Sequence, residues 1–270
     1  MIETLIAVGG FQLKTLSVFQ LLSFLVVAMI IWKRSKEENY PETKVFDGFL
    51  LSFLFGLVVG RVGHIIFSWP RFEWDVLKWI NLVQHPGVQL LFGLIGACAY
   101  LFFYAKKQKW DAFEILDWWA QAITLGLVWI NLGFFMAGTR FGNETQLPWG
   151  IIFPGVFEKR HPTQLYFLIF HLAMYKFLNW LEYNYRTFEW YRSGKKTAQT
   201  GIVFACLVLC FSVFSLLMTF FQPPIFMVGS LVLDSAIYLS LMVFSLFVIL
   251  NRANRIFFSF SDKKFFAVKK

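Results

Sequence analysis

The chain alternates between long apolar segments and short stretches rich in polar and charged residues. A helix needs about 20 apolar residues to cross the hydrocarbon core of a bilayer. Seven segments have about this length, so the pattern predicts an all-α polytopic membrane protein with about seven transmembrane helices. No internal repeat or soluble domain is evident, and we expect residues 1–270 to form a single membrane domain. The expected spans are roughly 13–32, 47–68, 87–104, 113–137, 162–181, 201–221 and 226–250.

The basic residues predict which ends of these spans face the cytoplasm. Of the 25 Lys and Arg residues, 17 fall in flanks on one side of the predicted membrane and six on the other. Because cytoplasmic flanks are enriched in Lys and Arg, the N-terminus is expected outside and the C-terminus in the cytoplasm. Two substantial loops, 69–86 and 138–161, are then outside. The cytoplasmic flanks are 33–46, 105–112, the polar connection 182–200 and 251–270.

Composition agrees with a membrane protein and limits the other functions. The chain is 58% hydrophobic and only 15% charged, well below the charged fraction of an average soluble domain. Its net charge of +9 is explained by the cytoplasmic flanks, so we expect no nucleic-acid partner. Cys98, Cys206 and Cys210 lie in apolar segments without metal-ligand spacing, which predicts buried thiols, no metal site and no cofactor. No basic region precedes the apolar residues of the N-terminus, so a cleaved signal peptide is not expected.

The fourth predicted span carries a polar stripe. It consists of Asp117, Gln121, Thr124, Val128 and Asn131, at i, i+4, i+7, i+11 and i+14 on one helical face. Such groups either hydrogen-bond to neighbouring helices or form the polar wall of a substrate cavity, and the sequence leaves both interpretations open.

The second predicted span combines small residues with a cationic group. Its glycines, Gly56, Gly60 and Gly63, share one face, which predicts close approach of a neighbouring helix. Arg61 is either a side chain that reaches the outer interface or an anion-binding group, because a guanidinium fork suits phosphate oxygens. Asp234 of the seventh predicted span needs a partner at membrane depth, and we expect that partner to be Arg61.

The fifth predicted span begins within the sequence EKRHPTQLYFLIF, residues 158–170. Pro162 suits the first helical turn, where its missing N–H costs nothing. Lys159 and Arg160 add positive charge beside the positive end of the helix dipole, so an anion is favoured here. The polar stripe that follows is consistent either with structural hydrogen bonding or with a lipid-headgroup site. It consists of His161, Gln164, Leu168, His171 and Tyr175.

Several of these stretches resemble, in the same order, the motifs of bacterial prolipoprotein diacylglyceryl transferases. The sequence HPTQLYF at 161–167 is similar to the family's HP-S/T-QLYE signature. The second span resembles its D…GaRlGYvlf segment, and FGLIGA at 92–97 matches the end of its F-H-G-G-L-I-G motif. The region 117–154 follows the family's D…P…lGq…GRiGNFiNgElyG…LPWavvFP pattern in length and spacing. The coinciding residues there are Asp117, Gly126, Gly133, Gly138, Gly142, Leu147, Pro148, Trp149, Phe153 and Pro154.

The resemblance extends over roughly residues 13–224 and implies a seven-helix fold and a chemistry. The family transfers a diacylglyceryl group from phosphatidylglycerol to the lipobox cysteine of exported prolipoproteins, at the outer leaflet of the bacterial inner (plasma) membrane. The implied partners are phosphatidylglycerol or a similar anionic phospholipid, the lipobox signal peptide of prolipoproteins, and the membrane itself. We interpret His161 and Arg140 as catalytic, with Arg61 and Arg140 holding the lipid phosphate. The expected substrate-binding residues are Arg61, Gln164, Tyr166, Asn131 and Gly142.

The same alignment places apolar or uncharged residues where the family carries ionisable ones. The histidine of F-H-G-G falls on Leu91, the arginine of GRiGN on Asn131 and the following glutamate on Thr139. Since leucine neither takes a proton nor binds phosphate, an active enzyme has to use other residues. The alternative is a catalytically silent member that binds a lipid or lipopeptide; a transporter is less favoured, because no inverted repeats are evident. The other substituted positions are Lys14, Thr15, Leu16, Ser17, Phe134, Ala137, Phe167, Ser215, Thr219 and Gln222.

Overall fold

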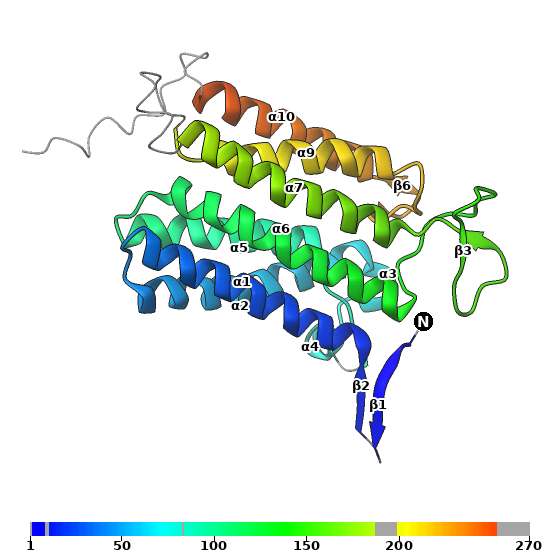
Figure 1. Ribbon diagram of the computed structural model, residues 1–270. Helices are drawn as coiled ribbons and strands as arrows, with labels where there is room; N and C mark the ends of the chain where they lie inside the picture. Colours follow the sequence, from blue (N-terminus) through cyan, green and yellow to red (C-terminus); the bar gives the residue numbers. More distant parts are fainter. Residues whose placement is uncertain (1, 9–10, 83, 187–198, 253–270) are drawn as a thin grey trace, which may run out of the picture.

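The computed structural model describes residues 2–8, 11–82, 84–186 and 199–252, and it confirms an all-α architecture (Figure 1). Each of the seven predicted apolar segments contains a helix. Five of these helices, α1, α2, α5, α6 and α10, are long and apolar enough to cross a membrane, so the chain is a multi-pass membrane protein. The seven helices are α1 (Thr15–Glu37), α2 (Glu42–Phe67), α5 (Leu90–Lys107), α6 (Ala112–Ala137), α7 (Thr163–Arg186), α9 (Ile202–Met218) and α10 (Asp234–Arg252).

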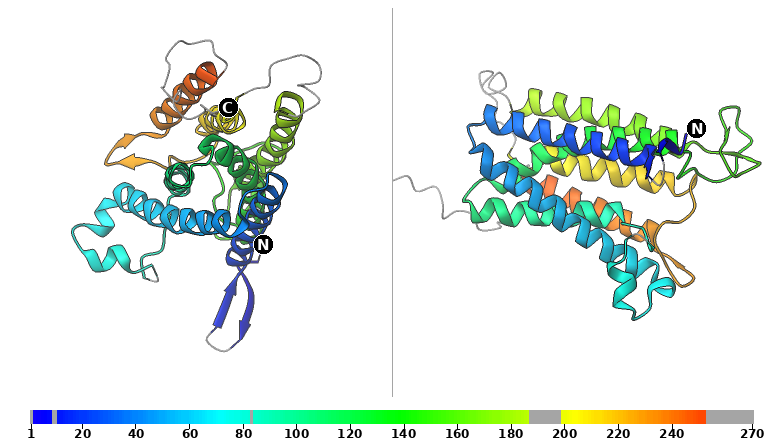
Figure 2. Two further views of the ribbon diagram at one scale, coloured as in Figure 1. Left: turned by 90° about the vertical axis from the view of Figure 1, so that its left-hand side faces the viewer. Right: turned by 90° about the horizontal axis from the view of Figure 1, so that it is seen from below.

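Helix α6 lies at the centre of the bundle and contacts α1, α5, α7 and α9. Helices α1, α2 and α5 pack on one side of it, and α7, α9 and α10 lie on the other (Figure 2). Trp118 and the small residues Ala120 and Ala122 of α6 are buried, because neighbouring helices surround it. The central helix therefore touches both halves of the bundle, and its two ends are the places where both halves can contribute side chains.

At one end of the bundle, polar residues of α6 bind other helices. Asp117 caps α9: its carboxylate accepts hydrogen bonds from the N–H groups of Gly201 at 2.7 Å and Phe204 at 2.8 Å. Gln121 bonds to Glu182 of α7 at 2.7 Å and accepts from Arg34 of α1 at 2.6 Å. For these two stripe residues, the prediction of interhelical hydrogen bonding is confirmed.

The glycine face of α2 is also confirmed. A Cβ atom on Gly56 would lie 2.8 Å from the carbonyl oxygen of Gly93 in α5, and one on Gly60 would lie 2.6 Å from the side chain of Val88. Gly63 would meet the ring of Phe92 at 2.9 Å. The absence of side chains at these three positions lets the backbones of α2 and α5 approach closely.

Short elements gather at the opposite end of the bundle, where Figure 1 shows the N-terminal hairpin, α3, α4, β3 and β6. Helices α3 and α4 and strands β3 and β4 belong to the loops 69–86 and 138–161, which the charge pattern predicts to be outside. Which face is cytoplasmic stays a prediction. Most of the predicted cytoplasmic connection 182–200 and of the flank 251–270 lies outside the described residues. The short elements are β1 (Thr4–Val8), β2 (Phe11–Lys14), α3 (Trp69–Phe72), α4 (Val76–Ile80), β3 (Ile151–Ile152), β4 (Lys159–Arg160), β5 (Met227–Val228) and β6 (Leu231–Val232).

At two places a strand occupies the start of a predicted span. The first span was expected from residue 13, but residues 11–14 form strand β2, paired antiparallel with β1. The seventh was expected from residue 226, but residues 227–232 form a β-hairpin that turns at Gly229, whose φ is +61°. The hairpin at 227–232 is apolar and continues into an apolar helix, and the alternating strand Phe11–Lys14 is only four residues long, so hydrophobicity alone does not mark either change.

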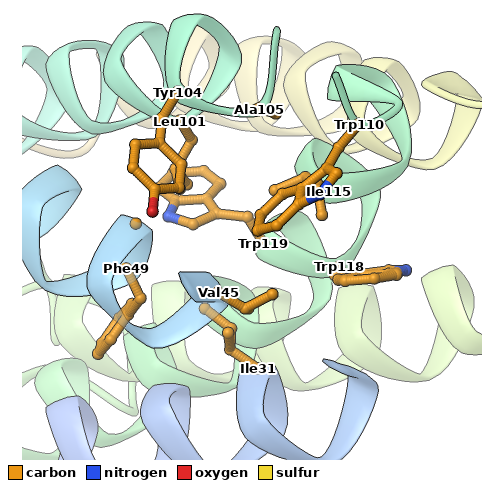
Figure 3. A pocket seen from close by; sticks show the side chains of 11 residues that line it. Ile31, Val45, Phe49, Leu101, Tyr104, Ala105, Trp110, Ile115, Trp118 and Trp119 are labelled. Atoms are coloured by element: carbon orange, nitrogen blue, oxygen red, sulfur yellow. The ribbon is translucent and has the colours of Figure 1, made fainter. Parts of the chain in front are cut away.

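A small apolar pocket lies between α1, α2, α5 and α6, near the end of the bundle where Asp117 caps α9 (Figure 3). It measures about 20 Å³, close to the minimum for a single water molecule, and aromatic side chains such as Tyr104, Trp110 and Trp119 line it. Its size and apolar lining indicate an imperfection of core packing. The residues predicted to act on a substrate lie at the other end.

Candidate functional site

The stretch from His161 to Gln164 holds the loop that follows α6. The backbone N–H of His161 donates to the carbonyl of Asn143 at 3.0 Å, and the N–H of Gly142 donates to the carbonyl of His161 at 2.8 Å. Thr163 donates its hydroxyl to the carbonyl of Arg140 at 2.8 Å, and the Gln164 amide donates to that of Thr139 at 2.6 Å. The motif thus fixes the backbone on both sides of Arg140.

The end of α9 closes this cluster from a third direction. The N–H of Asn143 donates to the carbonyl of Phe221 at 2.8 Å. A Cβ atom on Gly142 would lie 2.2 Å from that same oxygen, 2.7 Å from the methyl group of Thr163 and 2.9 Å from the Cβ of His161. Only glycine fits at this point, where segments following α6 and α9 meet the start of α7.

His161 and Tyr166 form an aromatic rim with two further residues. The Nδ1 atom of His161 lies 3.2 Å from the Tyr166 hydroxyl, which also accepts a hydrogen bond from the Trp149 indole at 2.9 Å. The ring of Phe221 packs edge-on against His161, with centroids 5.1 Å apart. Burial lowers the pKa of His161 below its ordinary value of 6.5, because a charged imidazole loses hydration here. At neutral pH the ring is therefore uncharged and available as a proton acceptor.

Arg140 is the cation of this cluster. Its backbone is left-handed, with φ of +61°, and its guanidinium carbon lies 4.8 Å from the centre of the Phe134 ring. Arg140 is exposed at the surface of the protein, but the many protein atoms around it reduce its hydration. This loss of hydration lowers the pKa of Arg140, while the nearby Tyr238 of α10 raises it. An arginine stays protonated under such shifts, so the cluster retains a positive charge close to α10.

Arg61 lies in α2 and binds the backbone of a different loop. Its guanidinium donates to the carbonyls of Lys78, Trp79, His85 and Gly87, at distances of 2.7 to 3.0 Å. These bonds engage four of its five N–H groups. The structure gives Arg61 an evident task in fixing residues 78–87, and its expected contact with a lipid phosphate stays a prediction.

The expected pair between Asp234 and Arg61 is wrong. The carboxylate of Asp234 accepts hydrogen bonds from the N–H groups of Ile225 at 3.0 Å and Phe226 at 3.1 Å. Backbone amides of the preceding turn satisfy the buried charge, just as backbone carbonyls satisfy Arg61. The sequence showed two ionisable groups at membrane depth and could not show these backbone partners.

The side chain of Asn131 bonds within its own helix. Its side-chain amide donates to the carbonyl of Leu127, one turn earlier in α6, at 2.7 Å. The structure thus brings together His161, Arg140, Gly142, Gln164 and Tyr166. Asn131 and Arg61, on helices α6 and α2, bond to other partners. The sequence reasoning did not single out Thr163 or Phe221 as parts of the site.

The comparison with known proteins identifies the family. A sequence model described as prolipoprotein diacylglyceryl transferase matches residues 3–251. The chain belongs to this family.

Among its relatives, the phosphatidylglycerol–prolipoprotein diacylglyceryl transferase of Clostridium tetani is 26% identical over 215 residues, 74% of this chain and 77% of that protein. The protein of the same name from Mannheimia succiniciproducens is 26% identical over 229 residues, 81% of this chain and 78% of its own. That from Aliivibrio fischeri is 30% identical over 181 residues, 65% of each chain. The residues that the family model matches, 3–251, extend from the N-terminal hairpin into the last turn of α10.

Within the prolipoprotein diacylglyceryl transferase family, the substituted motif positions of this chain acquire a structural meaning. Phe134, at a position where the motif carries asparagine, forms the aromatic surface under the Arg140 guanidinium. Thr139, where the motif carries glutamate, contributes its backbone carbonyl to Gln164. The signature residues 161–164 retain their framework role, while the groups around Arg140 differ from the family pattern.

Proposed function

We propose that this protein transfers a diacylglyceryl group from phosphatidylglycerol to the lipobox cysteine of exported prolipoproteins, in the bacterial inner membrane. The observation that carries the proposal is the family match over residues 3–251, together with the retained signature at 161–166. The relatives are named for this reaction. The substrates are an anionic phospholipid and the lipobox signal peptide of a prolipoprotein, which meet at the outer surface of the membrane.

The reaction forms one bond and breaks one. The acceptor thiol loses its proton, and the resulting thiolate attacks the glyceryl carbon that bears the phosphate ester. A carbon–sulfur bond forms, the carbon–oxygen bond breaks, and glycerol phosphate leaves with the electron pair. The reaction therefore requires an acceptor for the thiol proton and positive charge beside the departing phosphate.

Arg140 and His161 supply these two groups in the proposed mechanism. The guanidinium of Arg140 stabilises the charge that grows on the phosphate as the carbon–oxygen bond breaks. The imidazole of His161 accepts the thiol proton at Nε2, in the tautomer whose Nδ1–H donates to the Tyr166 oxygen. Gln164 and Gly142 hold the loop of Arg140 in place, and the proposed contacts of Asn131 and Arg61 with the lipid are secondary.

A catalytically silent lipid- or lipopeptide-binding protein is the second candidate. Leu91 of α5 stands where the family motif carries histidine, and the side chain of Asn131, at a motif arginine position, bonds to its own helix. The substitutions at these two positions support a protein that has lost the transfer activity and still binds the lipid.

A transfer assay separates the two candidates. We expect the purified protein to move label from diacylglyceryl-labelled phosphatidylglycerol onto a lipobox peptide, and not onto the same peptide with its cysteine replaced by serine. A family member that retains the motif histidine serves as the positive control. If that control labels the peptide and this protein does not, while it still binds the lipid, the silent candidate is correct.

The pH dependence of transfer tests the role of His161. Because burial lowers the pKa of this imidazole, it stays uncharged down to pH values below 6.5 and loses its proton-accepting form only in more acidic solution. We expect the ratio of the wild-type rate to the His161→Gln rate to fall as the solution is acidified, with its midpoint below pH 6.5. Taking the ratio cancels the effect of ionisation of the acceptor thiol, because that effect is the same in both rates. A midpoint at or above pH 6.5 would contradict this role.

A further inference from the structure

Of the five buried side-chain polar atoms that have no hydrogen-bond partner among the described residues, two are Nε of Arg160 and Oγ of Ser215, and three are amide or imidazole atoms on or beside α7 and α9. These three are Oε1 of Gln164, Nε2 of His171 and Nε2 of Gln222, in side chains of which at most 9% is exposed. Proteins rarely leave such atoms unpaired, since each loses its hydrogen bonds to water without replacement. Their coincidence on two neighbouring helices indicates a place where a polar group is to be bound.

The protonation of His171 identifies it as an acceptor. Its Nδ1 lies 2.6 Å from the carbonyl oxygen of Phe167, and because a carbonyl only accepts, Nδ1 carries the hydrogen. The neutral ring therefore presents a bare Nε2. The rings of Phe167, Phe170 and Phe211 surround the imidazole, with centroids 5.2 to 6.3 Å away, so the lone pair lies in apolar surroundings.

These atoms occupy two levels of one seam between α7 and α9. Gln164 and His171 are seven residues apart, which places them on the same face about two turns from each other. Ring contacts align the helices: His161 packs on Phe221 at the outer level, and His171 lies near Phe211 at the deeper one. Gln164 and Gln222 thus belong to the outer level and His171 to the deeper level.

The seam adjoins the cation of the site. Tyr238 of α10 lies near enough to both Arg140 and Ser215 of α9 for each to influence its hydroxyl group, and Ser215 is fully buried. Thr163 and Gln164 also bond to the carbonyls of Arg140 and Thr139, so the outer level of the seam lies beside the loop that carries Arg140.

We propose that Gln164, His171 and Gln222 form a subsite that reads the free hydroxyl groups of the lipid headgroup. Two of the atoms accept and one donates, and a hydroxyl group is the small neutral function that satisfies both kinds. The terminal glycerol of phosphatidylglycerol has two such groups. This subsite rests on the proposed function only in placing the lipid phosphate at Arg140. It makes the protein selective among anionic lipids that carry the same charge.

Lipid binding tests the subsite without requiring transfer. The probes are phosphatidylglycerol and phosphatidylmethanol with identical acyl chains, since both are singly charged phosphodiesters and only the first has headgroup hydroxyls. We expect the wild type, measured by native mass spectrometry in detergent, to bind phosphatidylglycerol about tenfold or more tightly, the effect of one or two hydrogen bonds. His171→Phe and Gln222→Met, which preserve shape, should each weaken phosphatidylglycerol binding about three- to tenfold and leave phosphatidylmethanol binding unchanged.

Asn179→Leu is the matched control, because Asn179 lies two turns further along α7 and its amide already donates to Tyr175 at 2.7 Å. Equal affinity of the wild type for the two lipids would overturn the subsite, as would an equal loss for both lipids in the variants. If His171→Phe does not fold, the Gln222→Met variant alone tests the subsite. Gln222 lies beyond the end of α9, so its replacement does not disturb the packing of a helix. Selective binding without transfer would reject the proposed function and keep the subsite; transfer without selectivity would do the reverse.

Discussion

Replacing Arg140 by glutamine is expected to lower the rate of diacylglyceryl transfer about 100- to 1,000-fold, the usual effect of removing one group that stabilises transition-state charge. Arg140 is the cation of the cluster formed by residues 139–143 and 161–166. Its guanidinium packs on Phe134 and lies near Tyr238, so in the proposed mechanism it is the positive charge that binds the phosphate. The measurement is the initial rate of label transfer from phosphatidylglycerol to a lipobox peptide at saturating lipid.

Two further variants make this expectation specific. Arg140→Lys keeps the charge and loses the planar fork, so we expect it to recover part of the rate. Arg71→Gln removes another cation from the same end of the bundle, on the exposed surface of α3, and should leave the rate within about twofold because surface charges act weakly. If Arg140→Gln retained more than a third of the wild-type rate, a different residue would have to hold the phosphate.

Much of the fold follows from hydrophobicity because a bilayer imposes a simple rule on helix length. All seven apolar segments contain helices, and the glycine face of α2 meets α5 as its spacing predicts. The rule fails at the ends of spans. The hairpin at 227–232 is as apolar as the helix that follows it, so hydrophobicity does not mark where that span begins. The strand at 11–14 alternates apolar and polar residues, but over only four positions, which is too short a pattern to identify a strand.

The side chains of the candidate site could be predicted from the sequence, but the backbone groups that hold them in place could not. The signature at 161–166 identified His161, Gln164 and Tyr166, and spacing identified Gly142 and Arg140. The partners that fix them are carbonyl groups of residues 139, 140, 143 and 221. Every residue has a carbonyl, so no sequence pattern distinguishes those that accept these bonds.

The same reasoning explains why Asp234 and Arg61 were wrongly paired. Two opposite charges in apolar segments favour the prediction of an ion pair, because an unpaired charge is costly at membrane depth. In this fold each charge is instead satisfied by a turn that lies next to it in space: the amides of 225–226 for Asp234 and the carbonyls of 78–87 for Arg61. Both residues hold short segments at the predicted outer end, which prepares the framework around the site.

Gly142→Ala is expected to disrupt that framework and to abolish transfer. Its added Cβ would lie 2.2 Å from the carbonyl oxygen of Phe221, an atom that is itself bonded to the N–H of Asn143 and cannot rotate away. This steric clash is relieved only if the loop 139–143 moves away from the segment that follows α9. Such a movement breaks the hydrogen bonds around Arg140 and displaces its guanidinium. We expect a loss of about 3 kcal/mol in stability, at the upper end for overpacking a dense site.

The expected result is a lower melting temperature of the detergent-purified protein together with transfer reduced at least as much as by Arg140→Gln. Gly229→Ala provides the comparison: its Cβ would meet nothing within 4 Å, so it incurs only the conformational cost of a φ of +61°, about 1 to 2 kcal/mol, in the hairpin β5–β6. We expect that variant to keep its transfer activity. A Gly142→Ala protein with wild-type melting temperature and activity would mean that the contact between this loop and Phe221 does not hold the site together, and the role assigned to residues 161–164 in fixing Arg140 would fail with it.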